Sequence, residues 1–143
     1  MQETRTVREA ARGVLKKGWD LSLPVNPALL AEKLGMSVCD DPSLGEGSCS
    51  YLPENKTIFI RKQDSIPHMR YAIARGLAQA VSGKQARTPE MQIEFAQELL
   101  MPVVAMRTSV EISNLNVDGL LERFDVPREK LVLRLWQLGY LDD

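Results

Sequence analysis

The segment 69–81, MRYAIARGLAQAV, is the feature that most constrains how this chain can fold. Apolar side chains recur at intervals of three and four residues, at Ile73, Leu77, Ala80 and Val81, and this spacing predicts a helix with a buried face. Ala72, Ala74 and Ala78 keep part of the remaining helix surface small, which suits close packing. We therefore expect a central helix around which the other segments are arranged.

Arg75 and Gln79 lie four residues apart and share one face of this helix. In zinc peptidases that carry H-E-x-x-H on a helix, this spacing presents two imidazoles to one metal ion, and the intervening glutamate is the general base. An arginine stays protonated and has no lone pair to give a metal. The helix thus has the layout of a peptidase helix without its chemistry, and we expect neither a metal nor a cofactor.

Length and charge narrow the classes of protein further. The chain has 143 residues, 44% of them hydrophobic, which suffices for one domain with its own core but not for two full-size domains. Lysine and arginine total 18 against 19 acidic residues, so no bulk positive charge attracts nucleic acid or membranes. No segment has the character of a signal peptide or a membrane span, and we expect a soluble cytoplasmic protein.

The two cysteines do not form a zinc site with the available histidine. Cys39 and Cys49 lack the C-x-x-C spacing, and His68 is the single histidine of the chain. We expect two reduced thiols.

Patterns around the central helix predict an α+β fold. The expected strands are 37–39, 48–52 and 57–60, and we expect an antiparallel sheet, at least across the turn 53–56. Asp64 or Ser65 is expected to cap the central helix. The other expected helices are 4–17, 27–34, one ending before Pro102, 103–111, 117–124 and 128–138.

Five segments, taken in chain order, carry a resemblance to a known family. They read PVNPALLAEKLGMSV, GSCSYLPENKTIFI, MRYAIARGLAQAVSG, EFAQELLMP and LLERFDVPREKLVLRLWQLGYL. In this order they resemble the ImmA/IrrE family of small zinc metallopeptidases, which occur beside phage and mobile-element repressors and in bacterial stress regulation. The resemblance spans nearly the whole chain, and LLAEKLGMSV and FAQELLMP are its most specific pieces. It implies a zincin-like helical domain with a small sheet over residues 1–110, and a helix-turn-helix-like segment packed on it over 111–143.

The resemblance also implies that the catalytic motif of the family is degenerate here. Where the family has a phrase such as R-F-T-L-A-H-E-L-G-H, residues 70–79 read RYAIARGLAQ. Both histidines and the glutamate are absent, and their positions hold Arg75, Gln79 and Gly76 respectively. The third ligand of the family, a carboxylate at the start of the next helix, corresponds to Glu90, with the register off by about one residue. His68 lies roughly two helical turns before Arg75 and does not replace a ligand.

Two arrangements are open for the former active-site groove, whose expected binding residues are Arg70, Arg75, Gln79, Glu90 and Glu94. In the first, Arg75 donates to Glu90 or Glu94, so that a fixed positive charge balances a carboxylate. In the second, Arg75 reaches solvent beside Gln79.

The C-terminal segment is a second candidate site. Residues 117–138 predict helix, tight turn and helix, and Arg128, Lys130 and Arg134 are expected near the exposed side of the second helix, where such modules reach DNA. Intervening acidic residues dilute this charge. The segment is more often a packing unit, and Trp136 belongs either to the core or to a surface for a protein partner.

These observations favour a non-catalytic regulatory protein-binding module over an enzyme. The resemblance implies that the partner is a helix-turn-helix repressor or another host regulator in a phage or mobile-element context, which this chain would hold in the groove and antagonise by binding. An edge strand within 47–52 or 57–60 could take an extended peptide. The first alternative is a metallopeptidase with unusual ligands, such as His68, Glu90, Cys39 or Cys49, or with ligands from a partner subunit. The second is a DNA-binding regulator that uses the C-terminal helix pair.

Overall fold

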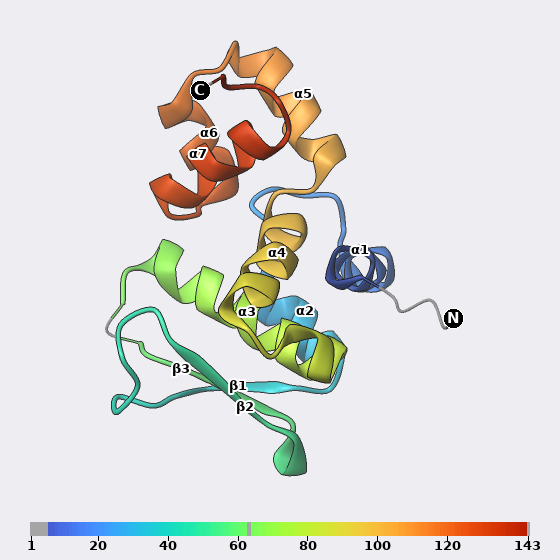
Figure 1. Ribbon diagram of the computed structural model, residues 1–143, viewed down its shortest axis with the longest axis vertical. Helices are drawn as coiled ribbons and strands as arrows, with labels where there is room; N and C mark the ends of the chain where they lie inside the picture. The colour runs from blue at the N-terminus through green and yellow to red at the C-terminus, as the bar shows by residue number, and fades with distance from the viewer. Residues whose placement is uncertain (1–5, 63, 143) are drawn as a thin grey trace.

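The computed structural model describes residues 6–62 and 64–142, and over these residues the chain forms seven α-helices and a three-stranded sheet (Figure 1). The α+β class is therefore confirmed. The strands are β1 (Ser37–Asp40), β2 (Cys49–Leu52) and β3 (Thr57–Ile60), and a short 3-10 turn, η1 (Pro53–Asn55), joins the last two. The helices are α1 (Val7–Gly18), α2 (Pro27–Lys33), α3 (Ile66–Ser82), α4 (Pro89–Leu100), α5 (Val103–Ser113), α6 (Val117–Phe124) and α7 (Arg128–Gln137), with a 3-10 turn, η2 (Gly83–Ala86), before α4.

Local capping explains where several helices begin. The side chain of Asn26 accepts a hydrogen bond from the backbone N–H of Leu29 at the start of α2, and Ser65 accepts one from His68 at the start of α3. Both helices also carry proline in their first turn, where its missing N–H leaves no donor unsatisfied. The predicted starts of these helices are confirmed. The predicted start of the first helix at residue 4 lies outside the described residues.

The sheet is mixed, with strand order β1-β3-β2. β2 and β3 pair antiparallel across η1, from Cys49 opposite Ile60 to Leu52 opposite Thr57, as predicted for this turn. The prediction of a wholly antiparallel sheet is wrong, because β1 runs parallel to β3, with Ser37 opposite Thr57. Two reversals of the chain, before and after β2, return β3 to the direction of β1. As the most apolar strand, β3 takes the central place with both edges paired.

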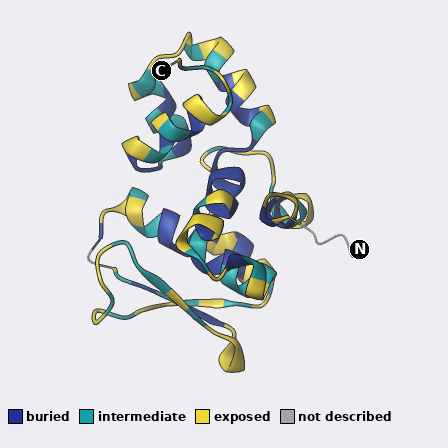
Figure 2. Cartoon of the chain, in the orientation of Figure 1, coloured by how far each residue is buried: buried dark blue, intermediate teal, exposed yellow. Residues whose placement is uncertain are grey.

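Helix α3 is buried around its whole middle rather than along one stripe. Tyr71, Ala72, Ile73 and Ala74 are buried, as are Gly76, Leu77 and Ala78, because β3 lies on one side of α3 and α1, α2 and α4 lie on others. Figure 2 shows the buried residues concentrated along α3 and α4. Val81, which the periodicity placed on the buried face, is 37% exposed in the last turn of the helix.

The helices α5, α6 and α7 gather at the end of the molecule opposite the sheet (Figure 1). Leu120 and Phe124 of α6 and Leu131 and Leu135 of α7 are each fully buried, and they belong to the same core cluster as the buried residues of α3 and α4. The division of the chain into residues 1–110 and 111–143 falls inside α5 and stays a prediction, as does the zincin-like relationship. Among the described helices, none combines the length and the apolar character needed to cross a bilayer.

Candidate functional site

Gly76 lies where α3 crosses the sheet, and the side chain of Ile58 fills the space next to it. A Cβ atom built on Gly76 would overlap Cγ2 of Ile58, a residue of β3 with no exposed surface. Glycine in the middle of a helix lowers its stability, so its presence here reflects the close approach of helix and strand. A side chain at position 76, such as glutamate, would require the Ile58 side chain or β3 to shift.

Arg75, one residue earlier, is held by neutral oxygen atoms. Its Nε and Nη2 donate to Oε1 of Gln92 at 3.2 and 2.8 Å, and its Nη1 donates to the carbonyl of Gly47 at 3.2 Å. Gln92 is buried in α4 and in turn donates to the carbonyl of Ala86 at 2.9 Å. Gly47 precedes β2, and its own N–H donates to the carboxylate of Asp64 at 2.9 Å. Arg75 therefore ties α3 to α4 and to the loop before β2.

Neither expected arrangement of Arg75 is found. Glu94 pairs instead with Arg8 of α1 at 3.0 Å, and Glu90 is exposed in the first turn of α4. The predicted ion pair of Arg75 with either carboxylate is wrong, because the guanidinium bonds to Oε1 of Gln92, which lies two residues from each of them and so on a different side of α4. The alternative, a side chain free in solvent, is also wrong, since Arg75 is half-buried and makes three hydrogen bonds.

Gln79 faces the sheet from the next turn of α3. Its Nε2 lies 3.4 Å from the sulfur of Cys49 on β2, so both degenerate polar positions of α3 contact the β2 side of the sheet. Cys39 and Cys49 are both free thiols, as predicted. Burial raises the pKa of the Cys49 thiol, and the charge of Arg75 opposes this shift. The thiol is protonated near neutral pH and is a poor metal ligand in that form.

We name the cavity beside Arg75 the α3 cleft. It has a volume of about 210 Å³ and lies between α3, the loop before β2 and the start of α7; its walls include Glu46, Gly47, His68, Tyr71, Arg75 and Lys130. The Tyr71 hydroxyl donates to Oε1 of Gln97 at 2.8 Å, and burial raises the pKa of Tyr71 far above its usual value, against the opposing charges of Arg75 and Arg134. Lys130 stands over the Tyr71 ring, with Nζ 5.4 Å from its centroid.

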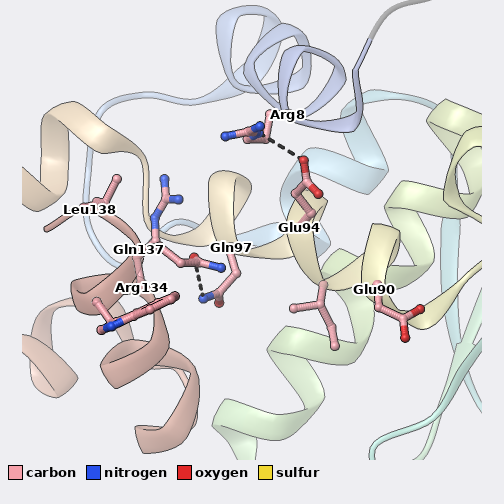
Figure 3. Close-up of a pocket in the computed structure, with 9 residues that line it drawn as sticks. Arg8, Glu90, Glu94, Gln97, Arg134, Gln137 and Leu138 are labelled. Carbon is pink, nitrogen blue, oxygen red and sulfur yellow. Dashed lines mark hydrogen bonds and ion pairs between the residues drawn. The ribbon is translucent and has the colours of Figure 1, made fainter. Parts of the chain in front are cut away.

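Glu90 and Glu94 line a different, larger cavity between α1, α4 and α7, shown in Figure 3. Its volume is about 390 Å³, and Gln97, Arg134 and Trp136 also line it. The Arg8–Glu94 ion pair crosses its rim, and the amide of Gln97 donates to Gln137 at 3.4 Å (Figure 3). Of the expected groove residues, Arg75 therefore lines the α3 cleft, Glu90 and Glu94 line the larger cavity, and Arg70 and Gln79 line neither of the two. Ile93 lines both cavities.

Arg70 joins the central helix to the C-terminal segment. Its Nη2 donates to the carbonyls of Val25 and Phe124 at 2.6 and 3.3 Å, and its Nε donates to the carbonyl of Asp125 at 3.0 Å. Carbonyls at the end of α6 carry partial negative charge, which a guanidinium stabilises. Arg70 thus holds the end of α6 against α3 and does not line the α3 cleft.

The basic residues of the C-terminal helix pair do not form one exposed face. Arg134 is buried, with its Nη2 at 3.1 Å from Glu98 and its Nε donating to the carbonyl of Met101, so the prediction that it lies on an exposed side is wrong. The reason is Glu98, a buried carboxylate of α4 that requires a cation. Arg128 is exposed and pairs with Asp118 at 2.7 Å. Trp136 is 51% exposed, which favours its surface interpretation over core packing.

The residues considered as unusual metal ligands do not converge. Among residues 6–62 and 64–142, no group of three or more His, Cys, Asp or Glu side chains is placed to hold an ion. His68 contacts Ser65 through Nδ1 at 2.7 Å and Glu129 through Nε2 at 3.7 Å, while Cys49 contacts Gln79.

Three residues of the site escaped the sequence interpretation. Gln92 and Gly47 accept from Arg75, and Ile58 fills the space beside Gly76. The glycine in mid-helix was a usable signal of close packing, whereas nothing in the order of residues marked Gln92 or Gly47 as partners of Arg75.

The comparisons with known proteins identify one shared fold and no sequence family. No protein-family model matches the sequence, and no curated protein matches it. Among solved structures, the chain is similar to one described as a Mycobacterium tuberculosis transcriptional regulator, with a TM-score of 0.70 and 20% sequence identity. The similarity covers 90% of this chain and 46% of that chain, so this chain spans less than half the length of that protein. The two chains share a fold over nearly all of the present sequence.

Proposed function

We propose that this chain is a non-catalytic cytoplasmic regulator, a degenerate ImmA/IrrE-like protein that binds a protein partner at the former active-site face and antagonises it by binding. The observation that carries this proposal is the packing of Ile58 against Gly76, because it occupies the space that a general base at position 76 would need. The hydrogen bonds of Arg75 and Gln79 support it, since each side chain already has partners in the fold.

The fold likeness supports a regulatory role. The similar solved chain is described as a transcriptional regulator, and it is more than twice as long as the part that this chain matches. We propose that the partner here is a helix-turn-helix repressor or another host regulator, in a phage or mobile-element context. The α3 cleft is the surface proposed for it, because it lies beside β2, whose outer edge is unpaired in the sheet. The second strand considered for peptide addition, β3, is central and has no free edge.

Direct DNA binding is the less favoured regulatory mechanism. Arg134 is buried against Glu98 and Arg128 is paired with Asp118, so these two cations are not both free to contact phosphates. The peptidase alternative requires several metal ligands around one ion. Among the described residues, His68, Glu90, Cys39 and Cys49 do not form such a cluster.

The test combines metal binding with the fate of a bound partner. Proteins retained by the purified chain from native-host extract are identified, and each is then purified and mixed with the full chain with and without a chelator. The proposal expects a stable complex, an intact partner in both conditions, and no stoichiometric zinc in the purified chain. Stoichiometric zinc together with chelator-sensitive cleavage of the partner would reject it.

A matched pair of variants locates the surface. Ile93→Glu places a charge between α3 and α4 at the α3 cleft, and we expect it to weaken the complex by about tenfold or more. Ile112→Glu introduces the same change on the exposed face of α5, where the isoleucine is 67% exposed, and should leave the affinity unchanged. Equal affinities for the two variants would place the partner elsewhere.

A further inference from the structure

No carboxylate among the described residues forms an ion pair with Arg75. Its three hydrogen bonds go to the amide oxygen of Gln92 and the carbonyl of Gly47, both neutral. A guanidinium has five N–H donors, so one N–H on each terminal nitrogen has no acceptor among the described residues. A half-buried cation with only neutral acceptors is stabilised further when an anion reaches it.

A second cation faces the same small space. Lys130 lines the α3 cleft with its ammonium over the Tyr71 ring, and no described carboxylate lies within ion-pair distance of it. Pro127 also lines the cleft and precedes α7 without a side-chain cap, so the positive end of that helix adds to the field. The opposing charges are Glu46, on the exposed loop at the cleft, and Glu129, which is next to His68.

The size and lining of the α3 cleft limit which anions can bind there. A volume of about 210 Å³ accommodates a side chain rather than a nucleotide, and Ala72, Ile93 and the Tyr71 ring offer apolar surface to its methylene groups. Gly47, whose carbonyl is bound by Arg75, lies two residues before β2, whose outer edge is open to an extended chain.

We propose that the α3 cleft binds the carboxylate of an aspartate or glutamate in an extended segment of the protein partner, with Arg75 and Lys130 as the contacting cations. This proposal rests on the proposed function and names the chemistry that the partner presents. The guanidinium supplies a fork of N–H groups to the carboxylate, and Lys130 supplies a second positive charge.

The test uses the full chain labelled with ¹⁵N and a short blocked peptide with a central glutamate between valines. We expect saturable shifts of the Gly47 amide and the Arg75 Nε–H resonances, and an affinity about tenfold higher than for the analogue with glutamine at the centre. Equal binding of the two peptides, or shifts confined to other parts of the molecule, would overturn the proposal. Inorganic phosphate is the third probe, and phosphate binding as tight as that of the glutamate peptide would also overturn it.

Variants of the two cations test whether their side chains contact the peptide carboxylate. Arg75→Gln should abolish the response, and Lys130→Gln should weaken it roughly threefold because Lys130 is partly exposed. Arg107→Gln, on the exposed surface of α5, is the matched control and should bind the glutamate peptide as the wild type does. If Arg75→Gln does not fold, the test rests on Lys130→Gln. A Lys130→Gln chain that binds the glutamate peptide with wild-type affinity would contradict the proposal.

The two proposals fail in different ways. Zinc-dependent cleavage of a partner rejects the non-catalytic function, whatever the peptide titration shows. Failure of the glutamate peptide to bind, with a stable complex and no zinc, rejects only the carboxylate pocket.

Discussion

The guanidinium of Arg134 lies 3.1 Å from the carboxylate of Glu98, and the two side chains are 6% and 4% exposed. This ion pair joins α7 to α4 and turns a basic residue of the C-terminal helix pair toward the interior. Glu98 also accepts from Arg12 of α1 at 3.2 Å, so one carboxylate links three helices. The C-terminal segment is therefore held to the rest of the molecule by buried charge as well as by apolar contacts.

Arg134→Met is expected to lower the free energy of unfolding by roughly 3–5 kcal/mol, because Glu98 would stay buried with only the half-exposed Arg12 beside it. Urea denaturation followed by circular dichroism measures this change. Arg128→Met is the control, and loss of its exposed pair with Asp118 should change stability by less than about 1 kcal/mol.

The double variant Arg134→Met/Glu98→Met should recover most of the lost stability, since apolar side chains of similar volume replace both charges. An effect of Arg134→Met no larger than that of Arg128→Met would contradict the buried position of the pair.

Gly76→Ala is expected to lower stability by about 1–3 kcal/mol, because the added methyl group overlaps Ile58 and forces α3 away from β3. In an Ile58→Ala background the same change should be neutral or stabilising, since the space is then open and alanine favours the helix. Thermal and urea unfolding of the four proteins in this cycle measure the coupling.

Gly119→Ala is the matched control for a helical glycine. The nearest atoms to a Cβ there lie 3.7–3.8 Å away, in ordinary contact, so this change should raise stability by roughly 0.5–1 kcal/mol. A destabilisation of the same size at both glycines would show that the effect at Gly76 does not come from Ile58.

Alkaline pH should destabilise the protein through Tyr71. Burial raises the pKa of this hydroxyl in the folded state, so as pH rises past about 10 the unfolded chain loses its tyrosine proton first and is favoured. The contribution of Tyr71 is thus fully present below that pH and is lost above it.

Comparison with Tyr71→Phe isolates this contribution. The variant should lose about 1 kcal/mol near pH 8, where the hydrogen bond to Gln97 is missing, yet its stability should fall less steeply between pH 9 and about 11. Urea unfolding at several pH values tests this. Parallel stability curves for the two proteins would show that Tyr71 ionises equally in both states.

The two thiols should differ in their rate of alkylation. Cys39 is exposed, whereas burial raises the pKa of Cys49 and reduces its thiolate fraction near pH 8. Mass spectrometry after brief treatment with iodoacetamide should find Cys39 modified well before Cys49, and both modified at equal rates in urea. Faster reaction at Cys49 in the folded protein would contradict the environment described for it.

The sequence by itself determined the helices and strands, because the signals that define them are local. Asn26 and Ser65 cap helices through hydrogen bonds to residues three positions away, and the prolines that follow them suit a first helical turn. The apolar strand 57–60 and the turn before it predicted the β2–β3 hairpin in the same way, and the reduced state of both cysteines followed from their spacing.

Only the tertiary structure decided which residues meet across the chain. The parallel pairing of β1 with β3, the choice of Gln92 over Glu90 or Glu94 by Arg75, and the inward turn of Arg134 each depend on positions that are distant in sequence. Such contacts are selected by the packing of whole elements, in which a shift of one helical turn exchanges one partner for another. The physical reason is that hydrogen bonding within a helix or turn is set by neighbouring residues, whereas the partner of a buried charge is set by what the completed core brings within reach.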